Sequence, residues 1–286
     1  MVRKITEIPA ERGTMSHATD EIPGQALHTI VWGILKFLLP TVGSCLYLFT
    51  VGLFRKRHRE LIYSIWTLIH TQLFTKKYVP EVEVAALVPD AVSLQLYEQS
   101  KITANISFEE LFVLVELLQI NHPAACFEIG TFDGRTTLNM AANTPDAAMI
   151  YTLDLPREQV DHTKFSLDPF ERFAVMKETS GIRYRGTIWE RKIQQLYGDS
   201  ATFDFTPYRG EIDFVFIDGS HTYEYVLSDS RNALTLLRNG KGTILWHDYP
   251  DTSSVLKAIH YLKVNDPRFA GIRHIAGTRF AYLTCE

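Results

Sequence analysis

The chain has 286 residues, of which 46% are hydrophobic, 22% charged and 12% aromatic, and its 29 basic and 33 acidic residues leave a net charge of −4. These values are ordinary for a globular protein and exclude a disordered chain, a collagen-like repeat and a small disulfide-rich scaffold. The mildly acidic balance argues against nucleic acid as a partner, because nucleic-acid-binding domains are usually strongly basic. A mean hydropathy of −0.05 excludes a polytopic membrane protein.

The composition divides the chain into four segments. Residues 1–27 are polar and predict a flexible tail. Residues 28–77 are apolar and predict a helical segment that associates with a membrane or oligomerises. Residues 78–104 are mixed in character and predict a linker, whereas residues 105–286 have the patterning of one folded domain. The three cysteines have no CxxC spacing, so neither a zinc site nor a disulfide framework is expected.

The apolar segment contains a run that is long enough to cross a membrane. Residues 29–54 carry a single charge, Lys36, and basic residues follow at once at 55–59. A crossing helix needs about 20 apolar residues, and basic residues just past a span favour the cytoplasmic side. We therefore expect membrane association through residues 29–74, with the main domain in the cytoplasm. Because Pro40 kinks or breaks a helix, a single span, a monotopic hairpin and a buried interface of a homo-oligomer all remain open.

From residue 105 onward, strand-like and helix-like patterns alternate. Ser107 and Glu110 form a capping box at the start of an apolar helix over 107–120. The alternation that follows predicts an α/β fold, a doubly wound, mostly parallel, seven-stranded Rossmann-like sheet with the N-terminal apolar segment as an appendage. The strands are expected at 125–130, 149–155, 193–197, 212–218, 242–248, 272–275 and 279–283, and the helices at 136–142, 222–237 and 253–264.

Acidic residues lie at or beside the ends of five consecutive predicted strands. In a sheet of this kind ligands bind outside the carboxyl ends of the strands. In the first turn, EIGTFDGRTT, Gly130 permits close approach of a ligand and Gly134 a tight turn. Phe132 stands where a dinucleotide fingerprint needs its second glycine, which disfavours a nicotinamide-dependent oxidoreductase. Asp154 suits the hydroxyls of a ribose, and Asp199 suits an adenine amino group.

The motifs EIGTFDGRTT, FVFIDGSHTYE and GTILWHDY together resemble those of the class I S-adenosylmethionine-dependent methyltransferases. They are most similar to the small-molecule O-methyltransferase branch, which includes catechol-type and macrolide-sugar enzymes. The resemblance covers residues 105–286 and implies S-adenosylmethionine as cofactor. It implies methyl transfer to a hydroxyl of a small molecule, a sugar or a lipid-linked metabolite. The cofactor-binding residues implied are Glu128, Gly130, Thr131, Asp133, Gly134, Asp154, Asp199, Ser200 and Asp218.

Two routes to the loss of the hydroxyl proton stay open. Asp218 and Asp248 match the acids that hold a divalent cation in the catechol-type members, where Mg²⁺ or, beside an imidazole, a transition metal would lower the pKa of a bound hydroxyl. Without a metal, His221 or His247 would act as the base. We therefore expect His221, His247 and Asp218 as catalytic residues and Asp218 and Asp248 as metal ligands. The long connection over 156–189 suits a lid or substrate loop.

The alternative function is a non-catalytic, membrane-tethered assembly protein that keeps the methyltransferase fold. It predicts that removal of residues 1–77 breaks assembly and that His221 and Asp218 are dispensable.

Overall fold

The computed structural model describes residues 42–43, 46–47, 50, 79–88, 92–97 and 105–286. The chain divides into two compact units, residues 1–67 and residues 68–286. The sheet belongs to the second unit. The segment boundaries expected after residues 27, 77 and 104 stay predictions.

The predicted membrane localisation is contradicted. Within the described part of the chain, no helix is both long enough and apolar enough to cross a membrane. A span needs about 20 apolar residues in one helix. Most of the run over 29–74, on which this prediction depended, lies outside the described residues.

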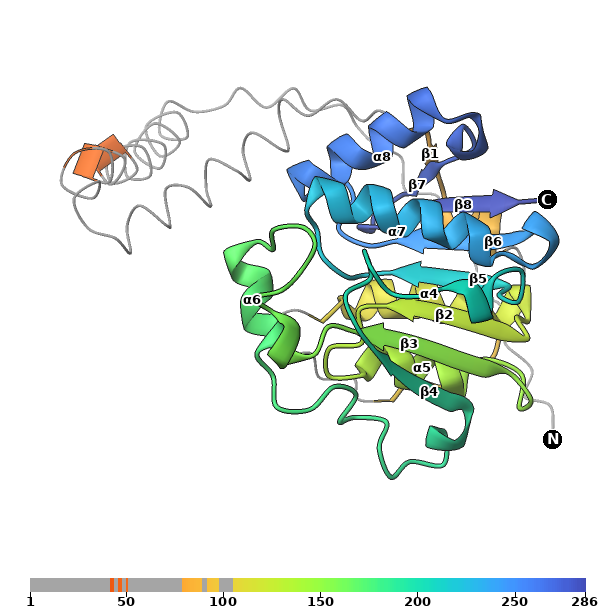
Figure 1. Cartoon of the computed structure of the whole chain (residues 1–286). Coiled ribbons are helices and arrows are strands. Elements are labelled where there is room, and N and C mark those ends of the chain that lie inside the picture. Colours follow the sequence, from red (N-terminus) through yellow and green to blue (C-terminus); the bar gives the residue numbers. More distant parts are fainter. Residues whose placement is uncertain (1–41, 44–45, 48–49, 51–78, 89–91, 98–104) are drawn as a thin grey trace, which may run out of the picture. The chain divides into compact units, whose positions relative to one another are not determined.

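An eight-stranded sheet organises the second unit (Figure 1). Its order is β1-β7-β8-β6-β5-β2-β3-β4, in which β8 is antiparallel to both neighbours and the other pairs are parallel. The seven predicted strands are all present, and an eighth, β1, lies in the predicted linker. The strands are β1 (Glu81–Val82), β2 (Ala125–Ile129), β3 (Met149–Asp154), β4 (Ile193–Tyr197), β5 (Phe214–Ile217), β6 (Gly242–Trp246), β7 (Arg273–Ile275) and β8 (Ala281–Cys285).

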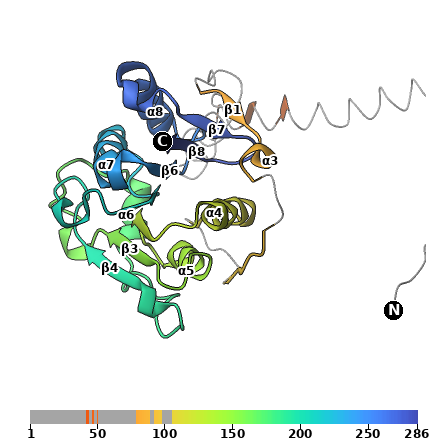
Figure 2. The same cartoon turned by 90° about the vertical axis from the view of Figure 1, so that its right-hand side faces the viewer.

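Helices cover both faces of this sheet, as the alternating pattern predicts. Figure 2 shows α4 and α5 on one face and α7 and α8 on the other. The α-helices of this unit are α3 (Val84–Leu87), α4 (Phe108–Asn121), α5 (Arg135–Ala142), α6 (Pro169–Val175), α7 (Tyr223–Leu236) and α8 (Ser253–Asn265). Short 3₁₀ turns occupy Arg157–Gln159, Glu190–Lys192, Thr206–Tyr208, Arg238–Gly240 and Pro267–Phe269.

The pleat of the central strands separates two apolar cores. Successive side chains of a strand point to opposite faces, so Phe214 and Phe216 of β5 join the core beneath α4 and α5. Val215 and Ile217 join the core beneath α7 and α8. All four side chains are buried, which explains why β5 reads as an unbroken apolar run rather than an alternating one.

The first helix of the domain begins at the predicted capping box. The Ser107 hydroxyl accepts the backbone N–H of Glu110 at 3.1 Å, and the Glu110 carboxylate accepts the backbone N–H of Ser107 at 2.7 Å. Two otherwise unpaired donors at the start of α4 are thereby satisfied. Glu110 itself is buried, an unusual place for a capping carboxylate.

The order of the strands places a ligand crevice at the middle of the sheet. From β2 the chain proceeds outward to β3 and β4, and then it returns to β5 and β6 on the other side of β2. Such a reversal leaves a crevice at the carboxyl ends of the two central strands. The residues that follow β2 and β5 therefore meet at this edge.

Candidate active site

A cavity of about 780 Å³ opens at this edge of the sheet. Its volume lies within the range usual for small-molecule sites. It is bounded by the turn after β2, the ends of β3, β5 and β6, and the long β3–β4 connection with α6. All site residues predicted from the sequence line it except Glu128 and Gly134: these are Gly130, Thr131, Asp133, Asp154, Asp199, Ser200, Asp218, His221, His247 and Asp248.

The turn after β2 needs its two glycines for different reasons. A Cβ atom on Gly130, where φ is +102°, would lie 2.1 Å from the carbonyl oxygen of Asp218, so the exit of β5 occupies that space. A Cβ atom on Gly134, where φ is +83°, would lie 2.7 Å from the Cα of Gly181. The carbonyl of Phe132 accepts the backbone N–H of Gly181 at 3.0 Å. The turn is thus packed against both β5 and the β3–β4 connection.

Glu128 lies beneath the turn and is completely buried. Its Oε2 accepts the hydroxyls of Thr137 and Thr152. Its Oε1 is buried without a hydrogen-bond partner among the described residues. Burial raises the pKa of this carboxyl to about 8, and the two threonine hydroxyls oppose that rise only in part.

Asp154 and Asp133 both hold the β3–β4 connection. Oδ2 of Asp154 lies 2.7 Å from the Lys177 ammonium and accepts the hydroxyl of Ser180. Oδ2 of Asp133 accepts Nε of Arg183 at 2.7 Å. Asp154, the predicted ribose ligand, therefore uses one of its two carboxylate oxygens to bind Lys177 and Ser180 of the β3–β4 connection.

The carboxylate of Asp199, predicted to contact an adenine, accepts three hydrogen bonds from the protein itself. Its carboxylate accepts the backbone N–H groups of Lys164 at 2.7 Å and Ala201 at 2.9 Å, and the hydroxyl of Tyr225 at 2.8 Å. These bonds attach the start of the β3–β4 connection to the end of β4 and to α7. Contact of Asp199 with an adenine stays a prediction, whereas its role in holding the connection is visible.

Glu171 of α6 fastens the same connection to the other side of the cavity. Its carboxylate accepts the hydroxyl of Ser220 at 2.9 Å and the backbone N–H of His221. Figure 1 shows α6 beyond the carboxyl ends of the parallel strands. The predicted lid over 156–189 thus spans from β3 to the loop after β5 and is held by carboxylates at both sides.

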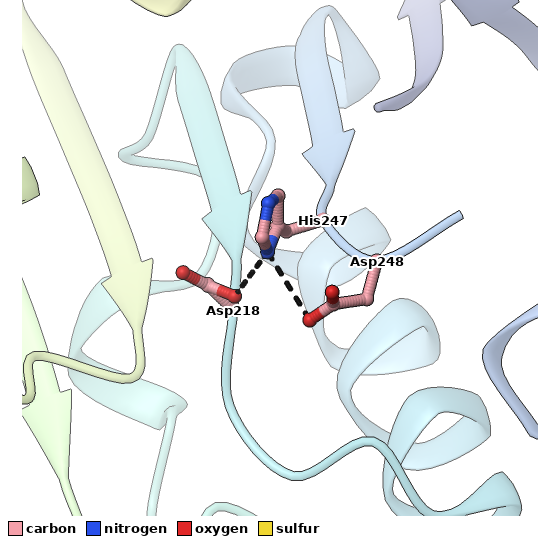
Figure 3. A group of neighbouring side chains, drawn as sticks. All are labelled: Asp218, His247 and Asp248. Carbon is pink, nitrogen blue, oxygen red and sulfur yellow. Dashed lines mark hydrogen bonds and ion pairs between the residues drawn. The ribbon is translucent and has the colours of Figure 1, made fainter. Parts of the chain in front are cut away.

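The ends of β5 and β6 bring three of the predicted residues together (Figure 3). Nδ1 of His247 lies 2.9 Å from Oδ1 of Asp218 and 3.1 Å from Oδ2 of Asp248. Its other nitrogen, Nε2, lies 3.3 Å from Oε2 of Glu110. The His247 side chain is only 5% exposed, so it is enclosed by carboxylates on both sides.

Two further cations contact Asp248. Nε2 of His221 lies 2.8 Å from Oδ2 of Asp248. Nη1 of Arg279, in the turn between β7 and β8, donates to Oδ1 of Asp248 at 2.9 Å. The same guanidinium donates to both oxygens of Glu110, from Nε at 2.9 Å and from Nη2 at 3.0 Å. Three carboxylates and three cationic side chains therefore form one network.

The network determines the charge of its histidines. Burial alone would lower the pKa of His221, but the carboxylates of Asp218 and Asp248 outweigh it and raise the pKa to about 10. The same opposition raises the pKa of His247 well above its usual value. Against their own burial, nearby cations hold the pKa of Asp248 and of Glu110 well below the usual range. Both imidazoles are thus charged at neutral pH in this arrangement.

Several residues of the site were not expected from the sequence. Glu110 was identified only as a helix cap, and its burial beside His247 has no sequence signature. Arg279, Glu171 and Lys177 lie in segments without a motif. Their roles depend on distant parts of the chain meeting at one edge of the sheet, as with Glu110 and Arg279, which are 169 positions apart.

The fit of a divalent metal can be tested on the donor atoms. One ligand atom each of Asp218, His247 and Asp248 lies within 4.8 Å of the other two, a spacing that a metal ion would accept. Both oxygens of Asp248 and Oδ1 of Asp218 are, however, already in contact with cationic donors. A guanidinium does not lose its proton in proteins. As arranged, this donor set does not fit a divalent ion.

Residues 127–249 match a family model described as a methyltransferase domain. The matched region runs from β2 to the residues that follow β6, so it includes the glycine turn and the ends of β5 and β6, as the sequence motifs of a methyltransferase predict. The resemblance stated from the sequence motifs is confirmed at this level. None of the curated proteins matches the sequence significantly.

Solved methyltransferase structures are similar at low identity. The O-methyltransferase TomG from Streptomyces achromogenes, involved in tomaymycin synthesis and solved with S-adenosylmethionine, is 16% identical, with a TM-score of 0.44, over 64% of this chain and 81% of its own. The O-methyltransferase from Bacillus cereus, solved with S-adenosylhomocysteine, is 14% identical, with a TM-score of 0.44, over 78% and 97%. The methyltransferase PaMTH1 from Podospora anserina is 15% identical, with a TM-score of 0.39, over 64% and 80%. Likeness at this level carries no argument about substrate or residue roles.

Proposed function

We propose that the chain transfers the methyl group of S-adenosylmethionine to a hydroxyl of a small molecule. The observation that carries the proposal is the joining of two kinds of surface in one cavity. One is the glycine turn with Asp154, which suits a nucleoside. The other is the charged group around Asp218 and Asp248, with His221 at its exposed side, which suits a hydroxyl that must lose a proton.

The cofactor side of the cavity fits S-adenosylmethionine. Gly130 lets the turn pack against the exit of β5, where a side chain would not fit, and the turn itself lines the cavity. Oδ1 of Asp154 is not used by Lys177 or Ser180, which both contact Oδ2, so it is available to a ribose hydroxyl. When bound, S-adenosylmethionine supplies a methyl group on a positively charged sulfur, which is a reactive donor.

On the acceptor side, His221 is a better candidate base than His247. Both nitrogens of His247 face carboxylates, and its side chain is only 5% exposed, so little of this imidazole can reach a substrate. The nitrogens of His221 also lie near carboxylates, Nδ1 at 3.4 Å from Glu171 and Nε2 at 2.8 Å from Asp248, but its side chain is 35% exposed. Methyl transfer also requires that the acceptor is aligned with the methyl group and that water is excluded. α6 and the residues just before it line the cavity, so they can contribute to both. Leu167, Phe173 and Val175 make this face of the cavity apolar, which favours an acceptor with an apolar body.

Calorimetry with S-adenosylhomocysteine tests the cofactor part of the proposal. We expect saturable binding to the full-length chain and binding at least about tenfold weaker to Asp154→Ala, because a hydrogen bond to a buried charged group is lost. Asp146→Ala is the matched control, since that carboxylate is 77% exposed and pairs with Arg191 at the surface. A folded wild-type chain that binds no S-adenosylhomocysteine would contradict the proposal and favour the non-catalytic alternative.

A further inference from the structure

Arg279 occupies the position from which a metal ion would have to approach Asp248. Its Nη1 donates to Oδ1 of Asp248 at 2.9 Å, while Nε2 of His221 lies 2.8 Å from the other oxygen. The carboxylate thus has a cation on each oxygen. An incoming divalent ion would meet the fixed positive charge of the guanidinium as well as the occupied oxygen.

The guanidinium is held in place from behind. Nε and Nη2 donate to the two oxygens of the buried Glu110 at 2.9 and 3.0 Å, a bidentate arrangement suited to the planar fork of arginine. The backbone N–H of Arg279 donates to the same carboxylate at 3.0 Å, and its carbonyl accepts the backbone N–H of Tyr249 at 3.1 Å. Arg279 is therefore fixed both to α4 and to the segment that follows β6.

The guanidinium still has donors to spare. An arginine side chain offers five N–H groups, and three of them are used by Glu110 and Asp248. Arg279 lines the cavity beside His221 and Asp248. The remaining N–H groups leave it able to face an electron-rich oxygen in the cavity, as a cation of fixed charge.

We infer that Arg279 is the resident cation of this site: its guanidinium neutralises Asp248 where a divalent metal would bind, so that the chain transfers methyl groups without a metal. This inference rests on the proposed function. Arg279 is a positioning residue, since it acts through the carboxylates that hold His221 and His247. Its removal should free Oδ1 of Asp248 and convert the group of Asp218, His247 and Asp248 into a metal site.

Calorimetric titration of the full-length protein with Mn²⁺ tests the inference without measuring activity. We expect no saturable binding to the wild type. Arg279→Met should gain saturable Mn²⁺ binding, and the added change Asp248→Asn should abolish it. Arg238→Met is the matched control, because that guanidinium also binds an aspartate, Asp213, at 2.8 Å, but before β5 at the opposite end of the strand.

Two results would overturn the inference. One is a wild-type chain that binds Mn²⁺ in a way that Asp248→Asn abolishes. The other is an Arg279→Met chain that retains its circular dichroism spectrum but takes up no Mn²⁺. If Arg279→Met does not fold, the wild-type titration still decides. Binding of S-adenosylhomocysteine is measured in the same preparation. A chain that binds S-adenosylhomocysteine but gives either overturning result contradicts only the role of Arg279, whereas a folded chain that does not bind it contradicts the proposed function.

Discussion

At the scale of single residues, the site is a set of carboxylates whose protonation is determined by burial and by neighbouring cations. Burial dominates at Glu128, which is held by the hydroxyls of Thr137 and Thr152, and its pKa rises to about 8. His221 is held by carboxylates, so ion pairing dominates and its pKa rises to about 10. Both groups bind a proton more tightly in the folded chain than in the unfolded chain. Their consequences for stability and for activity can be measured separately.

Glu128 should make the free energy of unfolding fall as the pH rises from about 4.5 to about 8. In this interval the folded chain keeps a proton that the unfolded chain releases, so the slope has a negative sign and reaches about 1.4 kcal/mol per pH unit for this group. Glu128→Gln removes the titration. Urea unfolding at pH 5 and pH 8 should therefore show a smaller loss of stability in Glu128→Gln than in the wild type. Equal losses would contradict the assignment, and Glu211→Gln, 62% exposed in its side chain, serves as the control.

His221 should govern the pH dependence of the methyl-transfer rate. A base must be neutral to accept a proton, and a pKa of about 10 leaves only a small neutral fraction at pH 7. We expect kcat to rise with pH toward about 10 and to fall by about 10²-fold or more in His221→Gln. His122→Asn, exposed at the end of α4, is the control. A rate that levels off near pH 6.5, or a His221→Gln variant as active as the wild type, would assign the base elsewhere.

At the scale of elements, the β3–β4 connection is the part of the domain that departs most from a plain strand–helix alternation. It carries α6 across the carboxyl edge of the sheet and is attached by Asp133, Asp154 and Asp199 on one side. Glu171 attaches it on the other side. Long connections of this kind commonly cover a site. Asp133, Asp154 and Asp199 are themselves predicted cofactor-binding residues, whereas Glu171 is not. The attachment through Glu171 can therefore be removed without changing a predicted cofactor residue.

Glu171→Gln should loosen α6 without unfolding the domain. The variant keeps the shape of the side chain but loses the charge that accepts the N–H of His221 and the hydroxyl of Ser220. Hydrogen exchange measured by mass spectrometry should become faster over residues 165–180. Asp161→Asn is the matched control, because it removes an ion pair with Arg172 of the same helix. The side chains of Arg172 and Asp161 are 46% and 72% exposed, and ion pairs this exposed contribute little to stability. Unchanged exchange in Glu171→Gln would show that α6 is held by other contacts.

At the scale of the whole molecule, the reversal of strand order at β2 and β5 assembles the site. Glu110 comes from α4, which precedes β2, Asp218 follows β5, Asp248 follows β6 and Arg279 lies before β8. The two apolar cores, one on each face, hold these ends at a common edge. The site therefore depends on the fold of most of this unit, because its members extend from Glu110 to Arg279, 169 positions apart.

Much of this arrangement was predictable from the order of residues alone. Buried strands read as short apolar runs, and the capping box of Ser107 and Glu110 marks the start of α4, because both signals depend on local periodicity and local hydrogen bonds. The strand-end residues Asp154, Asp218 and Asp248 could be placed at one edge, because parallel strands share their carboxyl ends. The motifs at those ends also predicted a methyltransferase domain, whose family model matches residues 127–249.

The tertiary structure alone decided which charges meet. Glu110 is a helix cap by sequence, and only the packing of α4 beside β6 and the β7–β8 turn makes it a partner of His247 and Arg279. Whether His247 is a free base, a metal ligand or an enclosed imidazolium depends on such neighbours, because burial and opposite charge shift a pKa in opposite directions. Sequence periodicity determines which face of an element is buried, whereas the identity of the group across the interface depends on the fold.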